Sequence, residues 1–151
     1  MSWTFSSPDR GRHIFADVLA RYAAQTGDGR LGTVESRVRA AVRVAVTGRP
    51  GVGRSQVATA LSGAGLVVTP DVDGADAHVR VIAEALKPED ERALRDRSVP
   101  AVVVLNKADL AGADPGGPLA GAEGAAARLA AERGLPVVPM VALLADVALG
   151  D

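Results

Sequence analysis

The 151-residue chain contains no cysteine, only two histidines, and aromatic residues that make up just 3% of the sequence. Without cysteine there can be no disulfide, no thiolate metal site and no thiol catalysis. His13 and His78 lie far apart and in no metal-binding pattern, so each is interpreted as an ordinary surface or partly buried residue. The sequence also lacks the layout of a signal peptide, and Pro136, Pro139 and Asp146 interrupt its most apolar stretch. A cytoplasmic protein with no transmembrane segment is therefore expected.

A large excess of one charge is also missing, since the formal net charge is -1. This balance predicts neither a nucleic-acid-binding protein nor an acidic tail. Hydrophobic residues make up 48% of the chain, which is enough for the core of about one domain. Because aromatic rings are few, that core must be built from valine, leucine and alanine. Lysine is scarce too: among 17 basic residues, Lys87 and Lys107 are lysines and the rest are arginines.

Residues 1–41 are predicted to form an N-terminal helical extension. A Ser-Pro-Asp sequence at residues 7–9 is a helix start, apolar residues recur at helical spacing over residues 15–22, and Gly27 is the predicted stop. A turn then leads to a short helix with Thr33 as its expected cap. The first helix is expected to pack on the body of the domain. Its mixed charges disfavour the alternative, which is contact with a protein partner or a peripheral contact with a membrane.

The second predicted domain, residues 42–151, alternates apolar runs with helical segments. Strands are predicted over residues 42–46, 65–69, 77–83, 101–105 and 135–141, and helices over residues 55–61, 87–97 and 118–133. Near-continuous apolar strands that alternate with helices indicate an α/β fold with a mainly parallel sheet flanked by helices on both faces. In such sheets, ligands bind beyond the carboxyl ends of the strands. The chain is expected to end before a full closing helix, which indicates a minimal domain or part of a longer protein.

The first strand of this domain leads into a glycine-rich turn, Gly-Arg-Pro-Gly-Val-Gly-Arg-Ser at residues 48–55, which we call the glycine loop. Its spacing matches the phosphate-binding motif Gly-x-x-x-x-Gly-Lys-Ser/Thr, with Arg54 in place of the lysine. Glycines let backbone amides surround a polyphosphate, and the start of the next helix attracts the anion. Arg54 keeps the positive charge but is bulkier and planar, so binding is expected to survive better than catalysis. A glycine-rich turn without a ligand is the alternative.

A second polar motif, Asn106-Lys107-Ala108-Asp109, follows the strand at residues 101–105. Asp109 can accept hydrogen bonds from the ring N–H and the exocyclic amine of guanine, which adenine does not offer in that arrangement. A carboxylate left unpaired would reject the wrong base. The stem of Lys107 can lie along the ring, and Asn106 can brace the loop. The two motifs together predict a guanine-nucleotide site and disfavour an ATP-using P-loop kinase.

These motifs on a parallel-sheet background resemble the P-loop GTPases of the translation-factor-related class, and among them the Era-like and dynamin-like GTPases. The resemblance covers about residues 42–150. It implies a three-layer P-loop NTPase-like fold that binds GTP or GDP with Mg²⁺. The residues that it marks as nucleotide-binding are Gly48, Gly51, Val52, Gly53, Arg54, Ser55, Gln56, Asn106, Lys107, Asp109, Ala142 and Leu143.

The resemblance assigns further roles to a few of these positions. The backbone amide of Ala142 would reach the guanine oxygen. Ser55 and Asp71 would hold the metal, and Arg54 and Asp71 would act in catalysis by Mg²⁺-assisted attack of water on the terminal phosphoryl group. Asp71 is the first residue of an Asp-x-x-Gly match, and Thr69 is the alternative for its place.

The segment between the helix that follows the glycine loop and the strand at residues 77–83 is too short for the first switch region of these GTPases, so impaired magnesium binding and impaired positioning of the attacking water are expected. The chain is therefore interpreted as a divergent, shortened GTP-binding protein with slow or absent GTP hydrolysis. The alternative is a pseudo-GTPase, a protein-interaction module without nucleotide turnover. Besides the guanine nucleotide, a protein partner or the remainder of a longer chain is expected.

Overall fold

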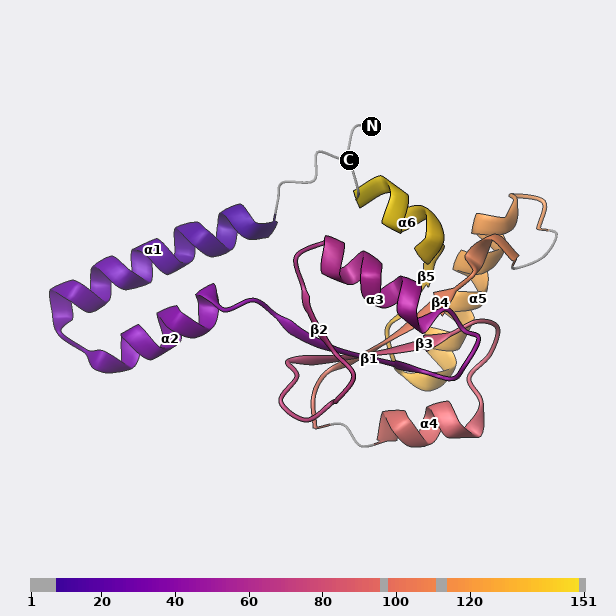
Figure 1. Ribbon diagram of the computed structural model, residues 1–151, viewed down its shortest axis with the longest axis horizontal. Helices are drawn as coiled ribbons and strands as arrows, with labels where there is room; N and C mark the ends of the chain where they lie inside the picture. The colour runs from indigo at the N-terminus through magenta and orange to yellow at the C-terminus, as the bar shows by residue number, and fades with distance from the viewer. Residues whose placement is uncertain (1–7, 96–97, 111–113, 150–151) are drawn as a thin grey trace. The chain divides into compact units, whose positions relative to one another are not determined.

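The computed structural model describes residues 8–95, 98–110 and 114–149, and the chain divides into two compact units, residues 1–41 and 42–151 (Figure 1). The first unit is a hairpin of two helices, α1 (Pro8–Thr26) and α2 (Gly29–Arg39). Gly27 lies between them with a φ of 68°, a left-handed conformation that suits the end of a helix. Arg39 joins the two helices, since its Nη2 lies 2.7 Å from Asp17 Oδ1.

Helix α2 begins earlier than the sequence predicts. Its N-cap is Asp28, whose Oδ1 accepts a hydrogen bond of 3.0 Å from the Arg30 amide. The prediction that Thr33 caps this helix is wrong, since Thr33 lies inside it. Aspartate is among the best N-cap residues and its charge favours a helix start, which outweighs the low helix propensity of the glycines that follow. The predicted cap of α1 at Ser7 lies outside the described residues.

The described part of the second unit is built on a sheet of five strands, all parallel, in the order β2-β1-β3-β4-β5. The strands are β1 (Arg43–Gly48), β2 (Val67–Thr69), β3 (Ala77–Ile82), β4 (Ala101–Asn106) and β5 (Val137–Met140). Valine-rich strands favour this arrangement, because a parallel sheet flanked by helices buries side chains on both of its faces. The predicted α/β class and parallel sheet are confirmed.

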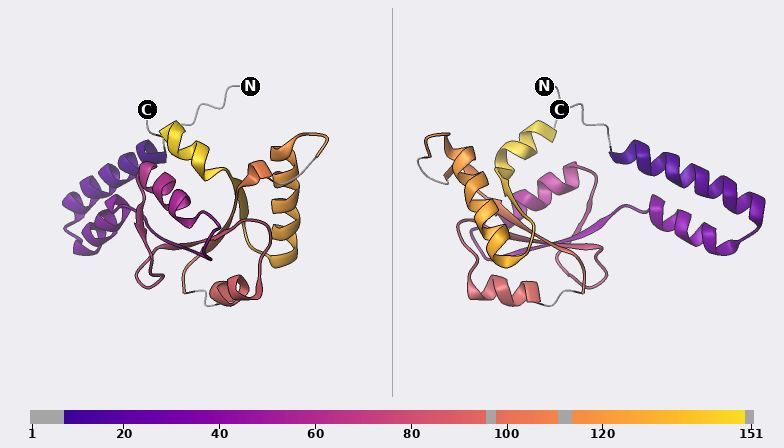
Figure 2. Two further views of the ribbon diagram at one scale, coloured as in Figure 1. Left: turned by 45° about the vertical axis from the view of Figure 1, so that its right-hand side comes forward. Right: turned by 180° about the vertical axis from the view of Figure 1, so that it is seen from behind.

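Helices cover both faces of this sheet (Figures 1 and 2). They are α3 (Arg54–Gly63), α4 (Pro88–Arg95), α5 (Pro118–Arg133) and α6 (Ala142–Leu149), with a short 3₁₀ helix, η1 (Ala108–Leu110). Val46 and Val81 point to the face that α3 and α6 cover, where they join one apolar cluster. Ile82 and Leu105 point to the face that α4 and α5 cover, where they join a second cluster. Neighbouring residues of a strand thus belong to different halves of the core.

The ends of several elements differ from the sequence-based prediction. Strands β2 and β5 each begin two residues later than predicted, at Val67 and Val137. Residues 96 and 97, where the charged helix is predicted to end, lie outside the described residues. The residues after β5 form α6, which packs against α3, although no full closing helix is expected. Alanine and leucine dominate residues 142–149, and their high helix propensity accounts for this helix.

Candidate functional site

The glycine loop joins the carboxyl end of β1 to the start of α3. Gly53 is the N-cap of α3 and has a φ of 83°, and a Cβ atom there would collide with the side-chain nitrogen of Asn106. At Gly48, a Cβ atom would lie 2.9 Å from the backbone oxygen of Val81. Both positions therefore require glycine, one for its conformation and one for the close approach of β3. No described side chain caps α3, so the amides of its first turn remain available to a ligand.

An open hollow of about 530 Å³ lies beside this loop, and we call it the loop hollow. Arg49, Arg54 and Lys107 contribute positive charges to its lining, and no carboxylate is among the described residues that line it. The remaining lining residues are Pro50, Gly51, Gly53, Ser55 and Gln56. The start of α3 adds the positive end of a helix dipole. The loop hollow is therefore electropositive and suited to an anion that carries several oxygens.

Asn106, the last residue of β4, ties the glycine loop to the end of the sheet. Its side chain is buried, its Nδ2 donates a hydrogen bond of 3.0 Å to the Val52 oxygen, and its Oδ1 accepts one of 3.0 Å from the Ala142 amide. One amide side chain thus links three segments that are far apart in sequence, the glycine loop, the end of β4 and the start of α6.

Lys107, the next residue of the motif, also contacts the glycine loop. Its Nζ donates a hydrogen bond of 3.0 Å to the Gly51 oxygen, so the aliphatic stem extends beside the loop hollow. Lys107 has a φ of 60°, the one described non-glycine residue with a positive φ. Such strained residues cluster at functional sites. Asp109 follows in η1 with an exposed side chain, and it is not among the described residues that line the loop hollow.

Ala142 and Leu143, which follow β5, are predicted to contact the nucleotide, with the Ala142 amide bound to the guanine oxygen. Ala142 and Leu143 are the first residues of α6, at the same edge of the sheet as the carboxyl end of β4. The Ala142 amide already donates to Asn106 Oδ1, so in this structure it is not free for a guanine oxygen. Leu143, one residue further along α6, is exposed.

Thr69 is the last residue of β2 and Asp71 follows it; Asp71 is the residue that the sequence predicts as a metal ligand, with Thr69 as the alternative. This strand ends where Thr69 pairs with Ala45, whereas β1 continues to Gly48. The chain then returns within residues 70–76 to the start of β1, where the Asp76 amide donates to the Arg43 oxygen at 2.8 Å. Neither candidate is among the described residues that line the loop hollow, which does include Ser55. The structure therefore does not bring Asp71 and Ser55 together at this hollow.

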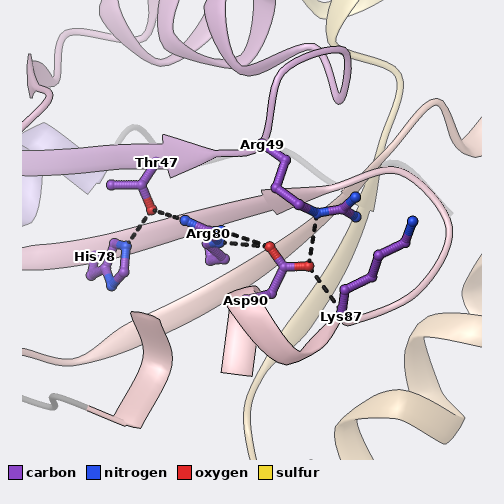
Figure 3. A network of polar contacts seen from close by, with 6 residues as sticks. All are labelled: Thr47, Arg49, His78, Arg80, Lys87 and Asp90. Atoms are coloured by element: carbon purple, nitrogen blue, oxygen red, sulfur yellow. Dashed lines mark hydrogen bonds and ion pairs between the residues drawn. The ribbon is translucent and has the colours of Figure 1, made fainter. Parts of the chain in front are cut away.

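A buried polar network lies beneath the glycine loop, between β3 and α4, and its centre is Asp90 (Figure 3). The Asp90 side chain is fully buried, and each of its oxygens accepts two hydrogen bonds. Arg80 donates to Oδ1 from Nε at 2.9 Å and from Nη2 at 2.7 Å. The Lys87 amide and Arg49 Nε donate to Oδ2 at 2.9 and 3.2 Å. Asp90 therefore connects α4 both to the sheet and to the glycine loop.

Thr47 and His78 extend the network across the same face of the sheet. Arg80 Nη1 donates to Thr47 Oγ1 at 3.2 Å, and this hydroxyl lies 2.6 Å from His78 Nε2. Burial, together with the charge of Arg80, lowers the pKa of His78 below its ordinary value. Burial by itself would raise the pKa of Asp90, but the hydrogen bonds from Lys87 and Arg80 and the positive charges nearby outweigh it and lower that pKa. His78 is thus neutral and Asp90 ionised at pH 7.

Sequence reasoning did not identify Arg49, Arg80 or Asp90. A signal was present, because an arginine and a histidine interrupt the otherwise apolar strand at residues 77–82. A buried arginine needs a carboxylate partner, and the three acidic residues in the first turn of α4 are among the carboxylates near it along the chain. What the sequence could not show is that the same carboxylate also reaches the glycine loop.

Comparison of the chain with protein-family models and with curated proteins finds no match. In the part of the chain that the structure describes, no helix is long and apolar enough to cross a membrane. Within the same residues, no group of three or more histidine, aspartate or glutamate side chains comes together to hold a metal ion. Ser55 is the predicted metal ligand that lines the loop hollow. The chemistry that the site supports is the binding of a phosphate-like anion by backbone amides and three cations.

Proposed function

We propose that the chain is a divergent GTP-binding protein with slow or absent GTP hydrolysis. The observation that carries this proposal is the loop hollow, where Arg49, Arg54 and Lys107 surround the start of α3. Such a site, at the carboxyl end of a strand and the beginning of a helix, attracts a polyphosphate through both charge and free amides.

The topology supports a phosphate site at this place, and we propose that the arrangement is a three-layer P-loop NTPase-like fold. In doubly wound sheets with the strand order 2-1-3-4-5, ligands bind outside the carboxyl ends of the strands at the switch point between the first and third strands. The sheet has this order, and the glycine loop follows β1 at this switch point. The fold and the motif therefore favour the same position for the ligand.

Guanine selectivity is proposed to come from the segment Asn106 to Asp109. Asn106 and Lys107 both hydrogen-bond to the glycine loop, which supports a base site near this segment for a nucleotide whose phosphates bind the loop. The exposed Asp109 carboxylate would accept the two guanine donors. Because Asn106 engages the Ala142 amide, the guanine oxygen would be bound by a later amide at the start of α6, and Leu143 is the residue we propose.

Slow or absent turnover is supported by the residues around the phosphate end. Mg²⁺ would be held by Ser55 and by water, and the ion would supply charge neutralisation at the phosphates. Asp71, the expected second anchor, does not line the loop hollow. Arg54 replaces the compact lysine ammonium by a guanidinium of different geometry. Arg54 keeps the charge that phosphate binding uses besides the backbone amides, whereas hydrolysis needs a precisely held water and metal, so we expect catalysis to suffer more than binding.

A pseudo-GTPase is the second candidate, and one observation favours it. Residues 70–76 connect β2 directly to β3 with no helix between them, so the chain has no room there for the mobile segments that respond to a terminal phosphate. In that case the fold would serve contacts with a protein partner or with the remainder of a longer chain. For either candidate we propose a cytoplasmic location.

The test is calorimetric titration of GDP, GTP and ATP into the purified chain, with and without Mg²⁺. We expect micromolar binding that prefers guanine and that Asp109→Ala weakens at least about tenfold, since an unpaired polar donor on the base is costly. Glu123→Ala, which removes an exposed carboxylate on α5, is the matched control and should change nothing.

Equal affinity for ATP and GTP would contradict guanine recognition, and absence of binding by every nucleotide would leave the pseudo-GTPase. Phosphate release, measured for the wild type and for Arg54→Lys, then tests turnover. We expect the lysine variant to hydrolyse GTP faster than the wild type. A wild-type rate typical of kinases, about 1–100 s⁻¹, would contradict slow hydrolysis.

A further inference from the structure

Arg49 is a cation of the loop hollow whose orientation is set by another element. Its Nε lies 3.2 Å from Asp90 Oδ2, and its side chain is 25% exposed. This bond uses one nitrogen of the guanidinium, and among the described residues none is hydrogen-bonded to the two Nη groups. In Figure 3 these two nitrogens point away from Asp90. Arg49 is therefore held at one end and free to donate at the other.

The charges around Asp90 do not balance. A single buried carboxylate is shared by Arg80, whose side chain is 10% exposed, and by Arg49. Two guanidinium groups thus share one carboxylate, and the cluster carries one net positive charge. An anion beside Arg49 would complete the charge balance of this partly buried group.

The position of Arg49 indicates which anion this would be. The start of α3 belongs to one face of the sheet, while Asp90 and α4 belong to the other face. Arg49 lies in the glycine loop between β1 and α3, its side chain reaches Asp90 on the α4 side, and it lines the same hollow as Arg54 and Ser55. A polyphosphate bound to the amides at the start of α3 would thus meet the Arg49 guanidinium on the α4 side of the hollow.

We propose that Arg49 binds the polyphosphate of the nucleotide and that Asp90 is a positioning residue, which holds Arg49 in the orientation needed. This inference rests on the proposed nucleotide-binding function. Arg49 is a second, separately anchored cation besides Arg54. Because Asp90 fixes the guanidinium before the ligand arrives, less side-chain entropy is lost on binding.

The first experiment compares Arg49→Met with Arg128→Met, a matched control on α5 that removes an exposed arginine outside the loop hollow. The probes are guanosine, GDP and inorganic pyrophosphate. We expect Arg49→Met to lower the affinity for GDP and for pyrophosphate about 10- to 100-fold, which is the range for loss of a hydrogen bond to a charged group. The affinity for guanosine should not change. Affinity for GDP within twofold of the wild type would overturn the role of Arg49.

A double-mutant cycle then tests whether Asp90 acts through Arg49. Asp90→Asn should weaken GDP binding in the wild-type background and have little further effect in Arg49→Met. An equal loss in both backgrounds would mean that Asp90 affects binding through stability alone, which thermal unfolding of the same samples measures. If Asp90→Asn does not fold, Asp90→Glu takes its place, since it keeps the charge while it displaces the carboxylate.

The outcomes separate this inference from the function on which it rests. Failure of the wild type to bind both GDP and pyrophosphate overturns the proposed function and the role of Arg49 together. Nucleotide binding that Arg49→Met leaves intact overturns the role of Arg49 alone. Pyrophosphate binding that Arg49→Met abolishes, without any preference for guanine, supports Arg49 as a phosphate ligand and overturns guanine recognition.

Discussion

The two faces of the sheet are stabilised in different ways, and β3 shows the difference within one strand. Val79 and Val81 belong to the apolar cluster under α3 and α6. His78 and Arg80, which alternate with them, are buried on the face of α4, where Arg80 pairs with the buried Asp90 and His78 contacts Thr47. Burial of valine is non-directional, whereas a buried arginine is tolerated because a particular carboxylate meets it. The α4 side of the sheet, which we call the polar face, therefore depends on individual partners in addition to its own apolar cluster, whereas the α3 side, which we call the apolar face, depends mainly on packed volume.

Asp90→Ala should remove the centre of the buried polar network and cause the largest loss of stability. Arg80 would remain buried without a counter-charge, and Arg49 would lose its anchor. Removing one partner of a buried ion pair costs about 3–5 kcal/mol of the free energy of unfolding. Urea denaturation followed by circular dichroism measures this loss.

The matched variant replaces both partners, as Asp90→Leu with Arg80→Met. It should recover most of the lost stability, because apolar groups of similar volume leave no unpaired charge. If the double variant is no more stable than Asp90→Ala, the cost lies in packing at α4 and not in the buried charge.

Asn106→Ala should produce the next largest loss of the free energy of unfolding. Asn106 is a buried polar residue at the end of β4, and it hydrogen-bonds the glycine loop and the start of α6. The Val52 oxygen and the Ala142 amide would both lose their partner. With about 1–3 kcal/mol for each of the two buried groups left unpaired, the loss is at most about 6 kcal/mol, and we expect about 2–4 kcal/mol because water replaces part of the contacts. Thermal unfolding measures it. A loss below 0.5 kcal/mol, the level of an ordinary surface substitution, would show that Asn106 is not a structural link.

Val81→Ala tests the apolar face at the position next to Arg80. Val81 is fully buried, and removal of its methyl groups should cost about 1–3 kcal/mol, from about 0.5–1.5 kcal/mol for each buried methyl. The exposed Val138 supplies the control, since Val138→Ala should change the unfolding free energy by less than about 0.5 kcal/mol. Equal effects of the two variants would contradict a packed core at Val81.

Lowering the pH should reduce the stability of the protein by a smaller amount, through His78 and Asp90. The pKa of His78 lies below its ordinary value of 6.5, so the unfolded chain takes up a proton before the folded protein does as the pH falls. Stability is then fully present above about pH 6.5 and is lost toward the folded pKa, with a slope of at most about 1.4 kcal/mol per pH unit. The pKa of Asp90 is also lowered, so a second loss begins near its ordinary value of 3.8 and continues to lower pH.

Urea denaturation between pH 5 and pH 7.5 measures the contribution of His78. In His78→Gln the slope in this range should shrink, while His13→Gln, which changes an exposed histidine, should retain it. Val81→Ala should shift the whole curve without changing its slope. An unchanged slope in His78→Gln would mean that other groups produce the pH dependence.

Much of the second unit could be predicted because its signals are local. The apolar run at residues 101–105 and the Gly-x-x-x-x-Gly spacing each predict their own backbone, and the strand and the loop form at these places. The same holds for α5, which begins at Pro118 and ends before Gly134 as its flanking residues indicate. The wrong cap at Thr33 shows the limit of local rules, since Asp28 competed for the same role.

Contacts between distant segments could not be predicted from these patterns. Asp71 fits its motif by sequence, but β2 ends where Thr69 pairs with Ala45, and Asp71 is not among the described residues that line the loop hollow with Ser55. Asp90 fits an ordinary helix start, yet it binds Arg80 and Arg49 from two different elements. Spacing along the chain does not specify which side chains meet across a sheet.

By itself, the sequence determined the parallel α/β sheet, the glycine loop and the polar segment after β4, because valine-rich runs and glycines act on the backbone near them. The tertiary structure alone decided which charges share Asp90, where the Asp71 loop turns back, and that Asn106 joins the glycine loop to α6. The physical reason is that a strand or a turn is set by neighbours along the chain. The partner of a buried charge or amide is set by the order and register of the strands, which form only when the whole sheet assembles.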